Sequence, residues 1–534
     1  MSMTETTEAP GTAPAGSTTT DVPVLPSELA GLAGWLSTAD HKRVGRMYLV
    51  TSLAFLVVGG VVGAILGVER IDSGLALVSS GSFEQLHTFH GEVAVLLFLV
   101  PFFLGLATYL VPLQVGAPDI AFPRGAAAAY WTYLASGLVL VGAYAADGGI
   151  TGGDAVAVDL YLLSLIALAT ATCVALGSVL TTIVTERAPG MTLLRTPLFT
   201  WSILVGGGLT LLTSPVLIAR LIELLIAHRY GGEVGSYADI SWFWSVPTVY
   251  LLVVPAAGVA LEIVPVIGAS RYRVHAAGII VLGAMGALGF GAFVRLEEAT
   301  SGIGSLVFVA MGLASLLPAL ALVGLLGDTL RRGRLTLSSS LLLALGAVVL
   351  LFLGALAGAA SVIEPLELDG MVWQVGQIHL TLYGGAVLGA FAALWYWAPK
   401  IWGVHLGELA GKAVFALTFL GALLLAAPDL VAGLVEDQAV RSATLDGNLL
   451  VGLNVVSLVG GVLGILGVLV AVGSLLSSVG RGNGVRATAD PWGGHTLEWA
   501  TTSPPPPGNF VGTVPVVTSP TPVLDARSDT EVPA

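Results

Sequence analysis

The segment Met371–Gly403 reads MVWQVGQIHLTLYGGAVLGAFAALWYWAPKIWG and carries a single imidazole, His379, inside a long apolar run. A second segment, His87–Leu113, reads HTFHGEVAVLLFLVPFFLGLATYLVPL and carries His90 near its start. Both segments exceed the roughly 20 apolar residues that a helix needs to cross a bilayer. Each histidine is therefore expected at or near membrane depth, where a polar ring needs a hydrogen bond, a proton path or a metal.

The composition of the whole chain is that of a polytopic membrane protein. Of its 534 residues 55% are hydrophobic and 10% are charged, and the mean hydropathy is +0.90. The apolar runs are long and continuous, unlike the short alternating segments of a β-barrel, so the predicted fold class is all-α. The net charge of −13 argues against a nucleic-acid partner. The single cysteine, Cys173, excludes an intrachain disulfide and a cysteine-based metal cluster.

The apolar stretches predict twelve transmembrane helices, an even number that places both termini on one side of the membrane. Residues 1–38 are predicted to form a disordered cytoplasmic tail without a cleavable signal sequence, residues 39–480 the membrane domain, and residues 481–534 a Pro- and Thr-rich cytoplasmic tail. The predicted spans cover approximately residues 44–68, 86–113, 127–147, 158–185, 197–228, 243–268, 275–295, 302–327, 336–362, 372–398, 408–433 and 447–478.

Lysine and arginine are distributed unequally between the two sides of this predicted bundle. Fifteen lie on the side of the amino terminus and three in the opposite loops. Because basic residues favour the inner side, this asymmetry predicts that both termini are cytoplasmic and that the protein is a multi-pass component of the plasma membrane. The three are Arg70, Arg229 and Arg441; the fifteen are Lys42, Arg43, Arg46, Arg124, Arg187, Arg195, Arg271, Arg273, Arg331, Arg332, Arg334, Lys400, Lys412, Arg481 and Arg486.

Five strings of sequence, in this order, resemble subunit I of the heme-copper oxidases, the catalytic subunit of cytochrome c and quinol oxidases. The resemblance runs from about Ala39 to Phe510 and implies the family's twelve-helix fold. The strings are ADHKRVGRMYLV from Ala39, HTFHG from His87 with YLVPLQVGAPDIAFPR from Tyr109, ERAPGMTLLRTPLFTWSILV from Glu186, LWYWAPKIWG from Leu394 and DPWGGHTLEWATTSPPPP from Asp490.

The resemblance implies that His90 and His379 are the two axial ligands of a low-spin heme, whose type, a or b, stays open. The family holds two hemes and a copper with six histidines, which this chain does not supply at membrane depth. The histidine that holds the oxygen-reducing heme in the family is replaced by Gln377. Of the eight histidines, only His87, His90, His275 and His379 are expected inside the membrane, whereas His41, His405 and His495 are expected in loops and His228 at a helix end.

The copper ligands of the family have no histidine counterparts in this chain. The family's His-Pro-Glu-Val-Tyr motif aligns with Val246-Pro247-Thr248-Val249-Tyr250, and its adjacent histidine pair aligns with Arg295 and Leu296. An alkyl group and a guanidinium do not replace imidazole as copper ligands. The resemblance therefore implies a degenerate member with no copper, no catalytic residue and no oxygen-reducing centre, although Asp119 matches the entrance acid of one proton channel.

Two further departures concern the surroundings of the remaining heme. The arginine that contacts a formyl group of the low-spin heme in the family aligns with Gly67. The arginine pair near the propionates aligns with Ala439 and Val440, and Arg441 follows them. These departures leave the heme type open.

Several of these residues also have a purely structural interpretation. His90 and His379 could bond neighbouring groups of the helices, and His87, one turn before His90, is either an alternative ligand, a propionate partner or an interface residue. A charge such as Glu92 costs roughly 2.5–3.5 kcal/mol at membrane depth, so we expect Glu92 to have a partner or a proton. Arg295 is expected to snorkel to the interface or to occupy the copper pocket.

The sequence thus predicts a subunit of a respiratory electron-transfer complex that keeps a bis-histidine heme but does not reduce oxygen. As the resemblance implies, its partners would be membrane lipid, other respiratory subunits such as one resembling subunit II, and an electron donor such as a cytochrome, a copper protein or a quinol. Two alternatives are a non-redox scaffold subunit of a membrane complex and an active terminal oxidase with unusual ligands.

Overall fold

The computed structural model describes residues 31–71, 77–149, 152–231, 248–289, 302–368, 372–435 and 448–530. Contacts divide the chain into a first unit, Met1–Thr38, which contains the short helix α1 (Leu32–Leu36), and a second unit, Ala39–Ala534. The second unit consists almost wholly of helices, with one two-residue pairing of β1 (Val404–His405) and β2 (Val485–Arg486) among its described residues.

Among the residues that the structure describes, ten helices are long and apolar enough to cross a membrane, and two shorter apolar helices, Leu251–Ile267 and His275–Gly289, accompany them. Each of them overlaps one of the twelve predicted ranges, so the prediction of an all-α polytopic membrane protein is confirmed, with ten to twelve candidate spans. The elements are α2 (His41–Glu69), α3 (Ser80–Glu92), η1 (Val93–Leu99), α4 (Val100–Val115), α5 (Pro123–Ala145), α6 (Ala155–Thr185), α7 (Leu198–Tyr230), η3 (Thr248–Val253), α9 (Val254–Ile267), α10 (His275–Gly289), α11 (Gly302–Ala314), α12 (Leu316–Arg332), α13 (Ser339–Ser361), α14 (Val372–Ile378), η7 (His379–Ala386), α15 (Val387–Trp402), α16 (Glu408–Val435), α17 (Asn448–Leu475) and η8 (Leu476–Gly480).

Polar caps and left-handed glycines determine where several of these helices begin and end. Asp40 caps α2 by accepting a hydrogen bond from the backbone N–H of Lys42, and Ser79 and Asp154 cap α3 and α6 in the same way. Gly116 ends α4 at φ 78° and Gly403 ends α15 at φ 73°, a conformation that a residue without Cβ adopts at little cost. These signals position the short turns that follow the two central spans.

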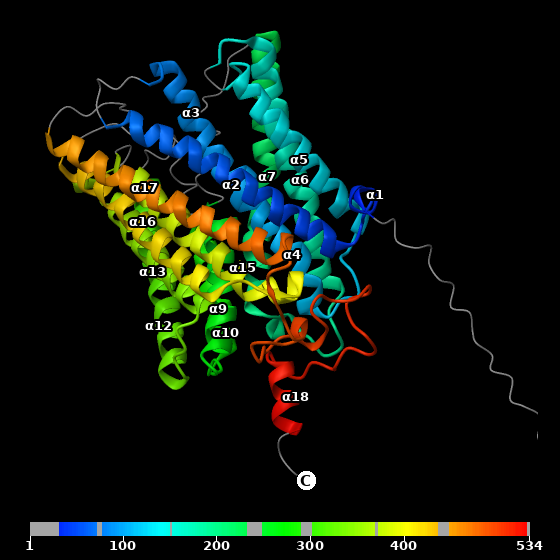
Figure 1. Cartoon of the computed structure of the whole chain (residues 1–534). Helices are drawn as coiled ribbons and strands as arrows, with labels where there is room; N and C mark the ends of the chain where they lie inside the picture. The colour runs from blue at the N-terminus through cyan, green and yellow to red at the C-terminus, as the bar shows by residue number, and fades with distance from the viewer. Residues whose placement is uncertain are drawn as a thin grey trace, which may run out of the picture. The chain divides into compact units, whose positions relative to one another are not determined.

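The helices pack so that the two histidine-bearing spans lie at the centre. In the most apolar window of Ser80–Val115 89% of the residues are buried, and in that of Val372–Trp402 78% are, against 17% to 56% in the other long spans. In Figure 1, α13, α16 and α17 group on one side of these central helices, and α5, α6 and α7 on the other. The outer helices instead present residues such as Leu212, Val216 and Ile280 outward, as a surface in contact with lipid requires.

The C-terminal segment, residues 485–530, folds back onto one end of the bundle. Its elements are β2, η9 (Leu497–Ala500) and α18 (Pro522–Thr530), and Figure 1 shows them below α4 and α15. The ammonium group of Lys400 donates to the carbonyl oxygens of Ala489 (3.1 Å), Thr501 (2.8 Å) and Thr502 (3.1 Å). A fully buried lysine at the end of a central helix therefore fixes the segment in place.

Further polar contacts join this segment to the bundle. Glu498 accepts hydrogen bonds from the side chains of Gln114 (3.1 Å) and Trp397 (3.3 Å), and burial raises the pKa of its carboxyl. Burial and the nearby Arg271 and Arg527 lower the pKa of His495 to about 4, so this buried imidazole is neutral at pH 7. The predicted extramembrane segment is thus packed against the helices where the structure describes it.

The prediction that His41 lies in a loop is wrong. It is not in a loop but is the first residue of α2, fully buried, and its two ring nitrogens lie 2.9 Å from the carbonyl oxygen of Thr108 and 2.9 Å from the side-chain oxygen of Asn509. The polar run Asp40–Arg43 has the composition of a loop. Its histidine is nevertheless buried, because the ring is bonded to Thr108 and Asn509, which are far away in the sequence. Charge and polarity alone did not reveal those partners.

Candidate functional site

A cavity of about 730 Å³ lies between the two central spans and the helices that flank them. Both His90, near the end of α3, and His379, the first residue of η7, line it. Most of the remaining lining is apolar, including Leu56, Phe98 and Leu425. The structure therefore brings together the two histidines that the sequence analysis singled out, although 289 positions separate them in the chain.

The ring of His90 is oriented by the backbone of α2. Its Nδ1 lies 3.0 Å from the carbonyl oxygen of Gly59, which only accepts, so Nδ1 carries the proton and donates. Gly63 makes room for this ring, because a Cβ at that position would lie 2.8 Å from Cε1 of His90. With Nδ1 occupied, Nε2 keeps a lone pair that can bind a metal.

The ring of His379 faces a buried carboxylate. Its Nδ1 lies 3.6 Å from Oδ2 of Asp429, on α16, and the other oxygen of Asp429 accepts from Arg70 at 2.8 Å. The Asp429 side chain is only 2% exposed. Thus both rings turn Nδ1 toward an acceptor in the protein, the arrangement that metal-bound imidazoles require.

Both histidines adjoin wide turns of π-helix. The π-helical segment η1 begins three residues after His90, and η7 begins at His379 itself. Such segments are rare, and they occur most often at functional sites, where an inserted residue changes the direction of a side chain. The third π-helical segment among the inner spans, η3, precedes α9.

Three other predicted residues lie around the cavity. Gln377 and His87 line it, and the ring of His87 stacks on Phe83 with 6.4 Å between centroids. Glu92 also lines it, but its carboxylate accepts hydrogen bonds from Tyr144 (3.0 Å) and Tyr161 (2.7 Å). The two tyrosines come from α5 and α6, so Glu92 has the partners that its depth demands and ties three helices together.

The remaining histidines of the sequence analysis lie elsewhere. His275 starts α10, does not line the cavity, and bonds the carbonyl oxygen of Thr196 through Nε2 at 3.1 Å. His228 pairs with Asp159 at 2.9 Å. Asp119 is exposed in the turn after α4, where its carboxylate accepts from the N–H of Ile120.

The positions aligned with the copper ligands lie outside what the structure describes. These are Val246, Arg295 and Leu296, together with Pro247 and the side chains of Thr248, Val249 and Tyr250; Ala439, Val440 and Arg441 are likewise not described. Gly67 does line the cavity, and Arg70, three residues later, lines it too. Arg70 thus supplies a guanidinium near the position where the family has one.

Asp429 and Arg70 are the site residues that the sequence analysis missed. Asp429 lies within a predicted span, where an ionisable residue is a functional hint in itself. Its partner Arg70 was counted only as a loop charge, because 359 positions separate the two residues. Among the described residues, no group of three or more His, Cys, Asp and Glu side chains forms a direct metal cage, so two imidazoles facing a cavity are the strongest ligand set there.

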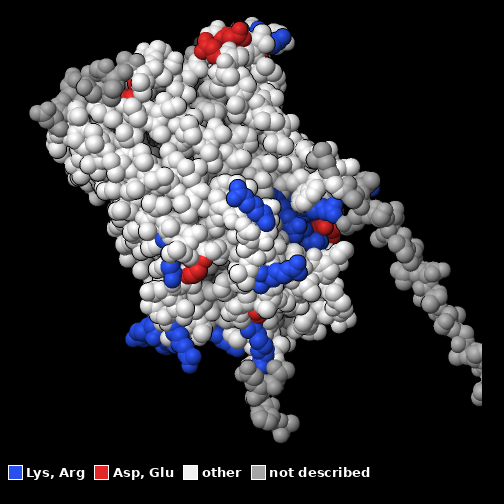
Figure 2. Space-filling model, in the orientation of Figure 1, with Lys and Arg blue, Asp and Glu red and all other residues white. Residues whose placement is uncertain are grey.

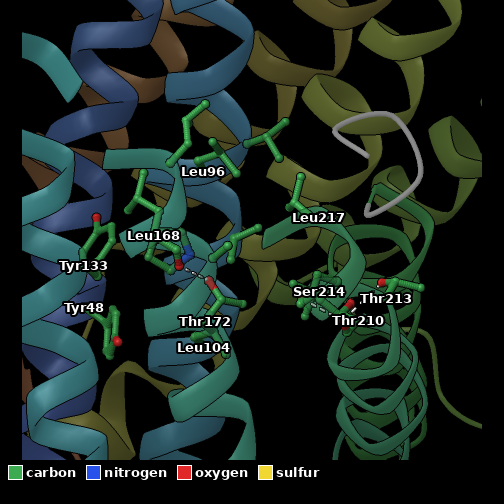
Figure 3. A pocket seen from close by; sticks show the side chains of 16 residues that line it. Tyr48, Leu96, Leu104, Tyr133, Leu168, Thr172, Thr210, Thr213, Ser214 and Leu217 are labelled. Atoms are coloured by element: carbon green, nitrogen blue, oxygen red, sulfur yellow. Dashed lines mark hydrogen bonds between the residues drawn. The ribbon is translucent and has the colours of Figure 1, made fainter. Parts of the chain in front are cut away.

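A second, smaller cavity of about 50 Å³ lies between α4, α6 and α7 (Figure 3). Its threonine and serine hydroxyls bond backbone carbonyls of their own helices: for example, Thr172 donates to Leu168 at 2.9 Å and Ser214 donates to Thr210 at 2.7 Å. These hydroxyls are already satisfied within their helices. The small cavity is therefore a packing space, and the chemistry of the chain concentrates in the larger one.

Comparison with known proteins agrees with this geometry. The family model described as Cytochrome C and Quinol oxidase polypeptide I matches residues 43–463. Curated relatives include a putative cytochrome c oxidase subunit 1-beta of Streptomyces avermitilis, 31% identical over 92% of each chain, and cytochrome c oxidase subunit 1 of Corynebacterium glutamicum, 31% identical over 90% of this chain and 87% of the relative. A heme-copper oxidase subunit I+III of Aeropyrum pernix is 33% identical over 92% of this chain and 62% of its own.

The match covers most of the chain and includes both histidine-bearing spans. The relatives align over nearly their whole length, apart from the longer archaeal protein. Such coverage at this identity establishes common descent and a common membrane fold. The chain therefore belongs to the heme-copper oxidase subunit I family, as a respiratory membrane protein similar to subunit I of cytochrome c and quinol oxidases.

Proposed function

We propose that the chain holds one six-coordinate, low-spin heme between His90 and His379 and relays electrons within a respiratory complex. The observation that carries this proposal is that two imidazoles, each with Nδ1 directed at an acceptor in the protein, line one cavity of about 730 Å³. When bound, the heme would supply a one-electron ferric–ferrous couple. If both histidines hold the iron, no ligand position would be left for oxygen, which suits electron transfer.

The cavity has the other features that such a group needs. Gly59, Gly60, Gly63 and Gly67 form one face of α2 along it, so backbone rather than side chains borders the space. An added Cβ at Gly63 would collide with His90, so the absence of a side chain there is required by the ring. Much of the lining is apolar, and Arg70 supplies a cation that can pair with a carboxylate at the edge of the cavity.

We further propose that the chain does not reduce oxygen and binds no copper at the family's site. The support is the identity of the residues: an amide, Gln377, replaces the imidazole of the second heme, and Val246, Arg295 and Leu296 replace the copper ligands. None of these groups is a suitable ligand for copper or for an open-coordinate heme iron. His275, the first residue of α10, does not compensate, because its Nε2 is hydrogen-bonded to the carbonyl oxygen of Thr196.

Spectra of the purified protein after heme-replete expression test these two proposals. We expect a reduced-minus-oxidised spectrum of one low-spin heme, no carbon monoxide adduct, less than stoichiometric copper and no cyanide-sensitive oxygen uptake. A missing Soret band would refute the heme site and favour a scaffold subunit. Stoichiometric copper, or carbon monoxide binding together with oxygen uptake, would instead revive the terminal oxidase.

Electrons would come from a reduced cytochrome, a copper protein or a quinol and pass to a partner subunit or a quinone, one at a time. This part of the proposal rests on the family, whose members include the oxidase subunits named among the relatives. It places the chain beside other respiratory subunits, including one resembling subunit II. Isolation of the chain from its native membrane without any companion subunit would contradict it.

Both termini are proposed to lie in the cytoplasm of a cell whose plasma membrane holds the protein. Figure 2 shows Lys and Arg side chains gathered at the end of the bundle that carries the C-terminal segment, in accordance with the fifteen-to-three distribution. Reporter fusions measure this directly. We expect a cytoplasmic signal after Arg486 and an external signal near Asp154, and the reverse at either point would overturn the orientation.

A further inference from the structure

The two proposed ligands differ in the chemical group that the Nδ1 atom of each ring faces. Nδ1 of His90 donates to a neutral backbone carbonyl, that of Gly59, at 3.0 Å. Nδ1 of His379 faces instead a carboxylate oxygen of Asp429, at 3.6 Å. One axial ligand is therefore supported by a dipole and the other by an anion.

The Asp429 contact is incomplete in a way that points to the cavity. Among the described residues, Nδ1 of His379 and Oδ2 of Asp429 are buried atoms that make no hydrogen bond, and they face each other. A buried donor and a buried acceptor left unpaired are unfavourable, whereas a displacement of less than about 1 Å would bring them within hydrogen-bonding distance.

Arg70 fixes the position of Asp429 and offsets its negative charge. The guanidinium donates to Oδ1 of Asp429 at 2.8 Å, and the backbone carbonyl of Arg70 accepts from the side chain of Asn454 at 2.7 Å. The carboxylate is thus fixed by a residue at the end of α2, which is itself held by α17. Oδ2 is left to point at His379.

A carboxylate behind the Nδ1–H of a ligand makes the imidazole more basic and a stronger donor to the metal. A stronger donor stabilises the ferric state more than the ferrous state, because the ferric iron carries one more positive charge. Conversely, the positive charge of Arg70 opposes this stabilisation. Asp429 and Arg70 therefore act on the iron in opposite directions.

We propose that Asp429 is a positioning residue that holds His379 through Nδ1 and lowers the reduction potential of the heme, with Arg70 as the counter-charge that limits the effect. This inference rests on the proposed heme site between His90 and His379. It joins His379 in η7, Asp429 in α16 and Arg70 directly after α2, and it gives a role to the buried carboxylate of Asp429.

A spectroscopic redox titration tests the inference with the full-length protein in detergent. Dithionite supplies one electron for each ferric heme, which becomes ferrous. For Asp429→Asn, which keeps the shape and an acceptor oxygen but removes the charge, we expect a more positive midpoint potential. The expected size is at least a tenfold change in the ferric-to-ferrous ratio at a fixed applied potential, equivalent to about 59 mV for a one-electron couple.

The matched variant Arg70→Gln should shift the midpoint in the opposite direction, to a more negative potential. Asp159→Asn is the control, because that carboxylate pairs with His228 and Arg229 and does not line the cavity. A low-spin spectrum with unchanged midpoints in both cavity variants would overturn the role of Asp429 while leaving the heme site intact. If Asp429→Asn does not retain heme, the Arg70→Gln variant decides. A more negative midpoint potential then supports the inference, and an unchanged midpoint contradicts it. A wild-type protein without a low-spin heme would refute both proposals at once.

Discussion

Replacing His379 with alanine should abolish the low-spin heme spectrum of the purified protein. In the proposed site this side chain would supply one of the two ligand nitrogens, and Gly63 and the carbonyl of Gly59 fix only the opposite ring, that of His90. With one imidazole removed, a six-coordinate bis-histidine iron cannot form, and we expect the low-spin Soret intensity per protein to fall by more than about tenfold. His90→Ala should have the same result.

The control for this prediction is His275→Ala. This histidine is also partly buried near a helix end, but it bonds the carbonyl of Thr196 and does not line the cavity. Its replacement should leave the spectrum unchanged. Imidazole added to His379→Ala provides a second check, since a small ligand entering the vacated space should restore the low-spin bands. An unchanged spectrum in His379→Ala would exclude this residue as the ligand and make the scaffold interpretation stronger.

Replacing Lys400 with methionine should loosen the C-terminal segment. Methionine keeps an apolar stem of similar length but leaves the carbonyl oxygens of Ala489, Thr501 and Thr502 without their donor. The ammonium also lies 5.1 Å from the ring centre of Trp499, a cation–π contact that is lost. Hydrogen bonds to a charged group contribute about 1.5–3 kcal/mol each, and removing a buried charge recovers part of that, so we expect a net loss of about 2–3 kcal/mol.

Hydrogen–deuterium exchange measures this loss locally. A decrease of this size in the free energy of opening corresponds to exchange that is roughly 30- to 160-fold faster at the protected amides of residues 489–510. Lys412→Met is the matched control, because its side chain is 45% exposed and lies 3.5 Å from a half-exposed Glu408, a pair worth less than about 1 kcal/mol. Equal exchange in the two variants would show that Lys400 does not anchor the segment.

The fold was predictable because the membrane imposes a length and a composition on each helix. The twelve apolar ranges needed only hydropathy, and the ends differ from the structure by several residues at most, as at Ser80, where the helix starts six residues before the predicted range. The sequence also drew attention to His90 and His379, because each is an imidazole at the start of or inside an apolar run, and the family resemblance implied their role as ligands. Hydropathy does not reveal that a π-helical segment begins three residues after His90 and that another begins at His379.

The polar partners of the site were less predictable than the histidines. Asp429 and Arg70 meet only because α17 packs against both α16 and α2, and no local pattern connects residues so far apart. Glu92 was flagged by its depth, yet its partners Tyr144 and Tyr161 became visible only in three dimensions. His41 was misplaced for the same reason: its polar neighbourhood hid the long-range bond to Asn509 that permits its burial.

The π-helical segments η1 and η7 set the angular register of the two central helices. One residue of an α-helix corresponds to a rotation of about 100°, so an extra residue in a wide turn places the parts before and after it in different rotational phases. His90 and His379 follow one phase, and the aromatic ends of the same spans, including Tyr109 and Trp397, follow another. Each central helix can therefore direct its histidine into the cavity at one level and its aromatic residues into the core at another, two directions that one uninterrupted helical phase would not provide together.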